Sequence, residues 1–163
     1  MANGLDLLAA AVQSETQAEM VDLAQQFLAQ RSLRWQEAGL SPALPDYEKQ
    51  REWLEGQARY VELEIWRQAS LAENYEPVPA LRDAPHFSRY TTFNRRWSQE
   101  IDQMGRMADD EGDGRFYYSG MAQAVLLDHL MPDWKRQALN EGIFLEDLLA
   151  TAAALNVEDD ESD

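Results

Sequence analysis

The chain has 163 residues, of which 45% are hydrophobic and 10% aromatic, which is enough for one domain with a buried core. Its 30 acidic and 14 basic residues give a formal charge of −16, which disfavours nucleic acid and anionic membranes as partners because phosphate contacts need a basic face. The sequence has no cysteine and no apolar run near the roughly 18 residues of a spanning helix, so it predicts no disulfide, no thiolate site and no membrane span.

The first part of the chain has the apolar periodicity of amphipathic helices. Leu5, Leu8 and Val12 predict a first helix, and a second is expected over residues 15–37 with Ser14 as its N-cap. The segment GLSPALPD then ends this helix with a glycine and two prolines.

A third helix is expected over residues 47–71. Its apolar residues recur at helical spacing, so we expect them to form the stripe that faces the core. The stripe consists of Tyr47, Leu54, Ala58, Val61, Ile65 and Ala69.

The second half of the chain predicts three main helices separated by loops. The segment ENYEPVPALRDAPHF carries three prolines and predicts a long loop. Helices are expected over residues 92–107, from about Arg115 through LLDHLM with a short segment after it, and over residues 143–155. Residues 157–163 should form an acidic, disordered tail. The sequence therefore predicts an all-α, bundle-like single domain of five to seven helices over residues 1–156.

The segment WLEGQARYVE places a glutamate and a glycine together inside the third helix. Glycine inside a helix costs about 1 kcal/mol relative to alanine, so Gly56 indicates that another helix approaches closely. Glu55 borders the apolar stripe, where a carboxylate is costly unless it is paired or binds a metal. The commoner alternative is a partly solvated glutamate at the edge of a helix.

The segment RFYYSGMAQAVLLDHL places Tyr117 at the start of a strongly apolar helix. A tyrosine there can present its hydroxyl to a cleft, where it donates a proton or stabilises an oxyanion. The commoner alternative is a core aromatic residue with its hydroxyl at the rim.

Together, the two segments resemble gluzincin metallopeptidases of the aminopeptidase type. WLEGQARYVE is similar to W-L-N-E-G-F-A-x-Y-x-E, whose glutamate before the glycine is the third zinc ligand. YYSGMAQAVLL is similar to Y-x-K-G-A-x-V-L, whose tyrosine stabilises the tetrahedral intermediate, and the order of the two segments matches. The resemblance implies that Glu55 is a metal ligand and Tyr117 a catalytic residue. Tyr60 and Glu62 match further positions of the first motif.

The sequence departs from the family pattern at three points. Leu54 replaces the asparagine before the ligand glutamate, and Ser119 replaces the lysine of Y-x-K-G. The motif H-E-x-x-H, which supplies two zinc ligands and the general base, is absent. The resemblance therefore implies either the helical half of a peptidase whose N-terminal half lies elsewhere, or a degenerate relative. We expect neither zinc nor catalysis on this chain alone.

The segment DDEGDG offers a weaker alternative, a calcium loop. Asp109, Glu111, Asp113 and Gly114 occupy positions 1, 3, 5 and 6 of an EF-hand pattern, but Gly120 stands where a bidentate glutamate is needed. A solvated loop is the simpler interpretation.

Three functions remain open on this evidence: a portion of a gluzincin-like zinc peptidase, a non-catalytic acidic helical module that binds a partner protein, and a weak divalent-cation binder. The expected partners are an N-terminal metallopeptidase half or a second copy of the chain. His86 and His129 are both expected to be structural or exposed. The first residues lack the basic segment of a signal peptide, and the sequence leaves the compartment open.

Overall fold

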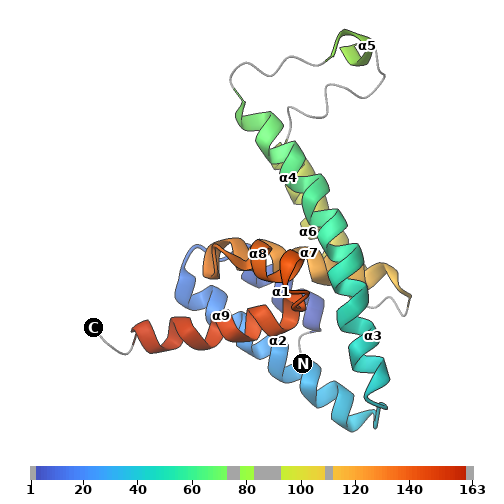
Figure 1. The fold of residues 1–163 in the computed structure, drawn as a ribbon, viewed down its shortest axis with the longest axis vertical. Coiled ribbons are helices and arrows are strands. Elements are labelled where there is room, and N and C mark those ends of the chain that lie inside the picture. Colours follow the sequence, from blue (N-terminus) through green and yellow to red (C-terminus); the bar gives the residue numbers. More distant parts are fainter. Residues whose placement is uncertain (1–2, 73–77, 83–92, 109–111, 161–163) are drawn as a thin grey trace.

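The computed structural model describes residues 3–72, 78–82, 93–108 and 112–160, and this part of the chain is helical apart from short connections (Figure 1). It contains no strand within those ranges. The elements are α1 (Gly4–Ala11), α2 (Gln17–Glu37), α3 (Ala43–Arg51), the π-helical segment η1 (Glu52–Gly56), α4 (Gln57–Leu71), α5 (Pro79–Arg82), α6 (Phe93–Met107), α7 (Gly114–Leu130), α8 (Trp134–Asn140) and α9 (Leu145–Asp160).

The all-α prediction is confirmed. Because α3, η1 and α4 follow one another without a break, they form one long rod, and the helices α1, α2, α7, α8 and α9 pack beside its lower part (Figure 1). Counting the rod as one helix and leaving aside the single turn α5, the described part of the chain has seven helices. No helix within it is long and apolar enough to cross a membrane.

Helix α7 is the centre of the core. Met121, Ala122, Ala124, Leu126 and Leu127 are all fully buried, so this helix is apolar on nearly every side. It contacts η1 and α4 of the rod as well as α1, α6 and α9. These five elements of the described chain therefore pack against this one helix.

The rod crosses α7 at two glycines. A Cβ atom placed on Gly56 would lie 2.6 Å from the carbonyl carbon of Gly120, and one placed on Gly120 would lie 2.8 Å from the Cα of Gly56. Both distances are too short for non-bonded atoms, so the two backbones touch only because neither residue has a side chain. This contact confirms that Gly56 marks a close helix approach.

The rod turns a different face to the core than its apolar stripe predicts. Tyr47, Leu54, Val61 and Ile65 are 43–56% exposed. The buried positions recur about every four residues instead: Glu48, Glu52, Gly56, Tyr60 and Leu63. The prediction was wrong because packing at the glycine crossing outweighs the burial of the aliphatic stripe.

Three helix boundaries also differ from the sequence prediction. The N-cap of α2 is Thr16, whose side chain accepts a hydrogen bond from the backbone N–H of Glu19, and not Ser14. Helix α3 begins at Ala43, before the expected position, since a proline is tolerated in a first helical turn. Helix α9 runs to Asp160, so the first residues of the expected tail are helical, while residues 161–163 lie outside the described part of the chain.

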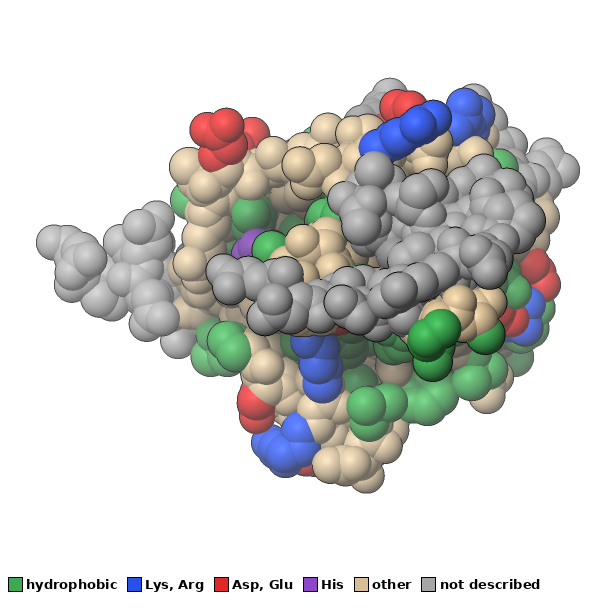
Figure 2. All heavy atoms as spheres, turned by 90° about the horizontal axis from the view of Figure 1, so that it is seen from above, with side chains coloured by type: hydrophobic (Ala, Val, Ile, Leu, Met, Phe, Trp, Pro, Cys, Tyr) green, Lys and Arg blue, Asp and Glu red, His purple; other side chains and the backbone are tan. Residues whose placement is uncertain are grey.

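Hydrophobic side chains also reach the surface, where they gather along one flank of the molecule (Figure 2). The largest exposed fractions on α4 and α8 belong to Leu71, at 63%, and Leu139, at 64%.

We expect Gly56→Ala to destabilise the protein by about 2–3 kcal/mol, because the added methyl group would push two helix backbones apart. Gly105→Ala is the matched control, since its Cβ would meet nothing within 4 Å on α6. The control should be about 0.5–1 kcal/mol more stable, through helix propensity. Urea unfolding of the two variants measures both effects, and a Gly56→Ala protein as stable as Gly105→Ala would contradict the crossing.

Candidate functional site

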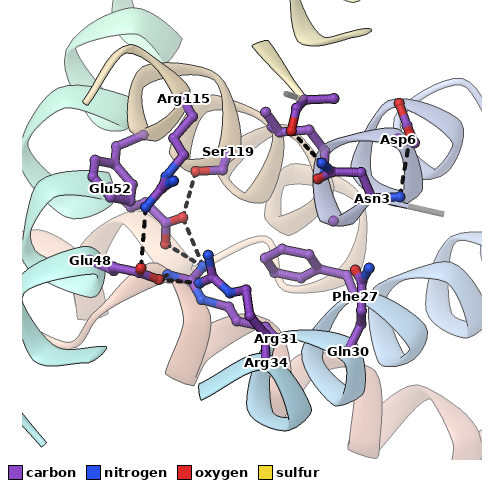
Figure 3. A pocket seen from close by; sticks show the side chains of 14 residues that line it. Asn3, Asp6, Phe27, Gln30, Arg31, Arg34, Glu48, Glu52, Arg115 and Ser119 are labelled. Atoms are coloured by element: carbon purple, nitrogen blue, oxygen red, sulfur yellow. Dashed lines mark hydrogen bonds and ion pairs between the residues drawn. The ribbon is translucent and has the colours of Figure 1, made fainter. Parts of the chain in front are cut away.

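A cluster of buried charges lies beside the glycine crossing (Figure 3). At its centre, Nη1 of Arg31 on α2 donates to both carboxylate oxygens of Glu52, at 2.8 and 2.7 Å. Ser119 and Gln123, one turn apart on α7, donate to the same carboxylate. Glu52 therefore accepts four hydrogen bonds and is 2% exposed, so its charge is buried but satisfied.

A second glutamate, Glu48, lies one turn earlier on the rod. Its carboxylate accepts hydrogen bonds from Arg34 and from the indole N–H of Trp35, the latter at 3.0 Å. Nη2 of Arg31 and Nη2 of Arg115 are 3.5 and 3.4 Å away. Four donors from α2 and α7 thus surround this carboxylate.

The network ends on α9, where the carboxylate of Glu146 lies 3.0 Å from Nε of Arg31 and 3.3 Å from Lys49. Burial raises the pKa of Glu146, against the attraction of these two cations. Burial also opposes the charged form of Arg31, but the attraction of Glu52 and Glu146 outweighs it and raises the pKa of that guanidinium. The arginine therefore stays charged and links three helices.

A cavity of about 580 Å³ opens next to this network, between α1, α2, the rod and the start of α7 (Figure 3). One wall is apolar and includes Leu5, Phe27 and Phe116, all of which are buried. The other wall is formed by the arginines and glutamates of the network. The volume of the cavity lies within the range of small-molecule sites.

The structure brings Glu55 and Tyr117 together near the glycine crossing, outside the lining of this cavity. The Tyr117 hydroxyl lies close to the Glu55 carboxylate, and the interaction with this carboxylate raises the pKa of the tyrosine. Tyr117 is 36% exposed, and Glu55 is partly exposed and paired with Arg51 at 3.0 Å. The two residues of the gluzincin resemblance therefore lie on one solvent-reachable surface, although an arginine already pairs with the carboxylate.

The other two motif residues take different roles. Tyr60 is buried, and its hydroxyl donates to Asp128 at 2.6 Å. Lys135 pairs with the same carboxylate at 2.7 Å and lies over the Tyr60 ring. Glu62 is exposed and pairs with arginines of α4 and α6.

The contacts among Tyr60, Asp128 and Lys135 shift the pKa values of the tyrosine and the aspartate. Burial raises the pKa of Tyr60 to about 12, with help from the hydrogen bond to Asp128. Burial opposes the charge on Asp128, but the hydrogen bonds from Lys135 and Tyr60 outweigh it and lower its pKa.

The described residues contain no group of three or more histidine, cysteine, aspartate or glutamate side chains that could hold a metal ion. Asp109 and Glu111 of the calcium-loop prediction and His86 lie outside the described part of the chain. Asp113 lies near Arg51 and Tyr47. His129 is exposed on the last turn of α7.

Sequence reasoning missed the buried glutamates of the rod. A signal was present, since Glu48, Glu52, Gly56 and Tyr60 repeat every four residues, as Ser119 and Gln123 do on α7. A repeat of polar and small residues on one helix face marks a close, hydrogen-bonded contact as well as a solvated surface.

No protein-family model, curated protein or solved structure matches the chain.

We expect Arg31→Met to destabilise the protein by about 3–5 kcal/mol, because it leaves Glu52 and its neighbours buried without their cation. Arg136→Met removes an arginine whose carboxylate partners are exposed, and it should change stability by less than about 0.5 kcal/mol. Urea unfolding at neutral pH compares the two. A loss below about 1 kcal/mol in Arg31→Met would show that the network carries no energetic weight.

The titration of Tyr60 predicts how stability falls in alkali. Its folded-state pKa, about 12, lies above the ordinary value of 10.0, so the unfolded chain ionises first and stability decreases as pH rises from 10 towards 12. Tyrosinate absorbance should show one late step near pH 12 that Tyr60→Phe lacks. An identical absorbance curve above pH 11 in both proteins would contradict the shift.

Proposed function

We propose that the chain is the helical portion of a gluzincin-like zinc metallopeptidase, or a degenerate relative, and is not catalytic alone. The observation that carries this proposal is the contact between Glu55 and Tyr117. The resemblance assigns both residues to one site, and they meet on one surface although they lie on different helices. The Glu55 carboxylate is partly exposed and Tyr117 is 36% exposed, so a ligand could reach both.

Each residue has a chemically suitable state for its role. Glu55 is partly exposed, so a metal ion could replace Arg51 as its partner. The Tyr117 hydroxyl is protonated at neutral pH, as a donor to a developing oxyanion must be, since even the ordinary pKa of a tyrosine, 10.0, lies far above 7. Zinc, when bound, would activate water and polarise the peptide carbonyl.

The described residues do not themselves fit a catalytic zinc ion, which takes three protein ligands, and Glu55 is a single carboxylate. The remaining ligands and the general base would have to come from another segment with an H-E-x-x-H helix. We therefore derive no catalytic step for the isolated chain, and its proposed part is one ligand and one oxyanion donor.

The groove between α4 and α8 favours a second candidate, the non-catalytic acidic interaction module. It has a volume of about 790 Å³ and is lined by the exposed side chains of Val61, Ile65 and Leu139, with Tyr60 and Trp134 at its base. An amphipathic partner helix would bury these side chains. The formal charge of −16 favours a partner with basic residues over a second copy of the chain.

The first candidate is tested on the protein as its own cells produce it. We would add a C-terminal affinity tag at the native gene, purify the product without chelators and measure zinc by elemental analysis and peptidase activity. We expect one zinc per chain, bound together with an H-E-x-x-H segment. Glu55→Gln should lose most of the zinc, and Tyr117→Phe should retain it but lose about a hundredfold in kcat.

Glu37→Gln is the control, since this glutamate is exposed at the end of α2, away from the crossing. It should keep both zinc and activity. A native product without zinc, or a Glu55→Gln product with full zinc, would overturn the peptidase proposal and favour the interaction module.

A further inference from the structure

The cavity of Figure 3 has a surplus of hydrogen-bond donors on its charged wall. Its two glutamates are already surrounded: Glu52 accepts four hydrogen bonds, and Glu48 has contacts from three arginines and a tryptophan. Among described residues, Arg34 makes one hydrogen bond, through a single Nη atom, although a guanidinium has five N–H donors.

Arg115 is the least satisfied of these side chains. Within the described ranges, its guanidinium has one polar contact, of 3.4 Å to Glu48, and lies over the Phe116 ring, while its Nε is buried without a hydrogen-bond partner there. A buried donor without an acceptor requires an explanation, and an absent ligand is one that the adjoining cavity allows. The side chains of Arg34 and Arg115 are 47% and 31% exposed, so the cavity is reachable from solvent.

The charges on this side of the molecule select the ligand. The charged side chains that line the cavity are balanced, because Arg31, Arg34 and Arg115 are matched by Asp6, Glu48 and Glu52, so the site does not share the overall acidic excess. One added negative charge is therefore tolerated better than a dianion. A guanidinium fork matches a planar carboxylate, and the apolar wall suits a hydrophobic body.

We propose that this cavity binds a small monocarboxylic acid, with its carboxylate paired to Arg115 and Arg34 and its apolar body between Phe27 and Phe116. Neither Glu55 nor Tyr117 lines this cavity, so the proposal stands or falls independently of the zinc proposal.

The test compares two probes that differ only in charge, N-acetylphenylalanine and its uncharged amide, by calorimetry on the purified chain. For about fifteen non-hydrogen atoms, we expect a Kd on the order of 1 mM for the acid. The amide should bind at least about tenfold more weakly, because it lacks the charge-assisted pair.

Arg115→Met removes the donors but keeps an apolar stem, and it should weaken the acid at least about tenfold. Arg136→Met, on the exposed face of α8, should leave the affinity unchanged. Circular dichroism and the urea midpoint check folding. If Arg115→Met does not fold, Arg115→Lys serves instead, and it should bind more weakly because it lacks the fork. Equal affinity for acid and amide, equal affinity of the Arg115 variant and wild type, or no binding of the acid by wild type would overturn the proposal.

Discussion

The backbone contact between η1 and α7 sets the positions of the other side chains around it. Since Gly56 and Gly120 touch without intervening side chains, their neighbours on the two helices must lie within hydrogen-bonding reach on both sides of the crossing. Glu52 meets Ser119, and Glu55 meets Tyr117. Both candidate sites are therefore consequences of the same contact.

The buried ion pair makes this contact specific. Desolvation of Arg31 and Glu52 cancels much of their attraction, so the pair adds little to net stability. A misplaced helix, however, would leave a buried carboxylate without its donors, which is far more costly than a misplaced leucine. Ser119 and Gln123 can both donate to Glu52 only when the rod has one position along α7. The network therefore fixes the position of the rod on the core.

The sequence predicted the elements better than their orientation. The helices α6 and α7 follow from periodicity and from loops that interrupt it, because both are local properties. The buried face of the rod did not follow, since the partner that allows Glu52 to be buried, Arg31, lies on another helix. The periodicity argument assigns the most hydrophobic face of a helix to the core. It contains no information about a charged partner on another helix. The contact of Glu55 with Tyr117 was expected only from the resemblance, since no local rule brings two separate helices together.

The two candidate sites have no residue in common, but both include residues from the first turns of α7. Tyr117 lies between Arg115 and Ser119 on the first turns of α7. Arg115 and Ser119 line the cavity, whereas Tyr117 lies close to Glu55. A bound carboxylate that draws Arg115 away from Glu48 would remove a contact between α7 and the rod. This contact is made by the same helix turn that positions the Tyr117 hydroxyl. Coupling between two sites is reciprocal, so each ligand would change the affinity for the other by the same factor. The two backbones touch at the glycine crossing, so neither helix can shift without moving the other. This coupling would therefore be carried by a shift of whole helices and not by a chain of flexible side chains.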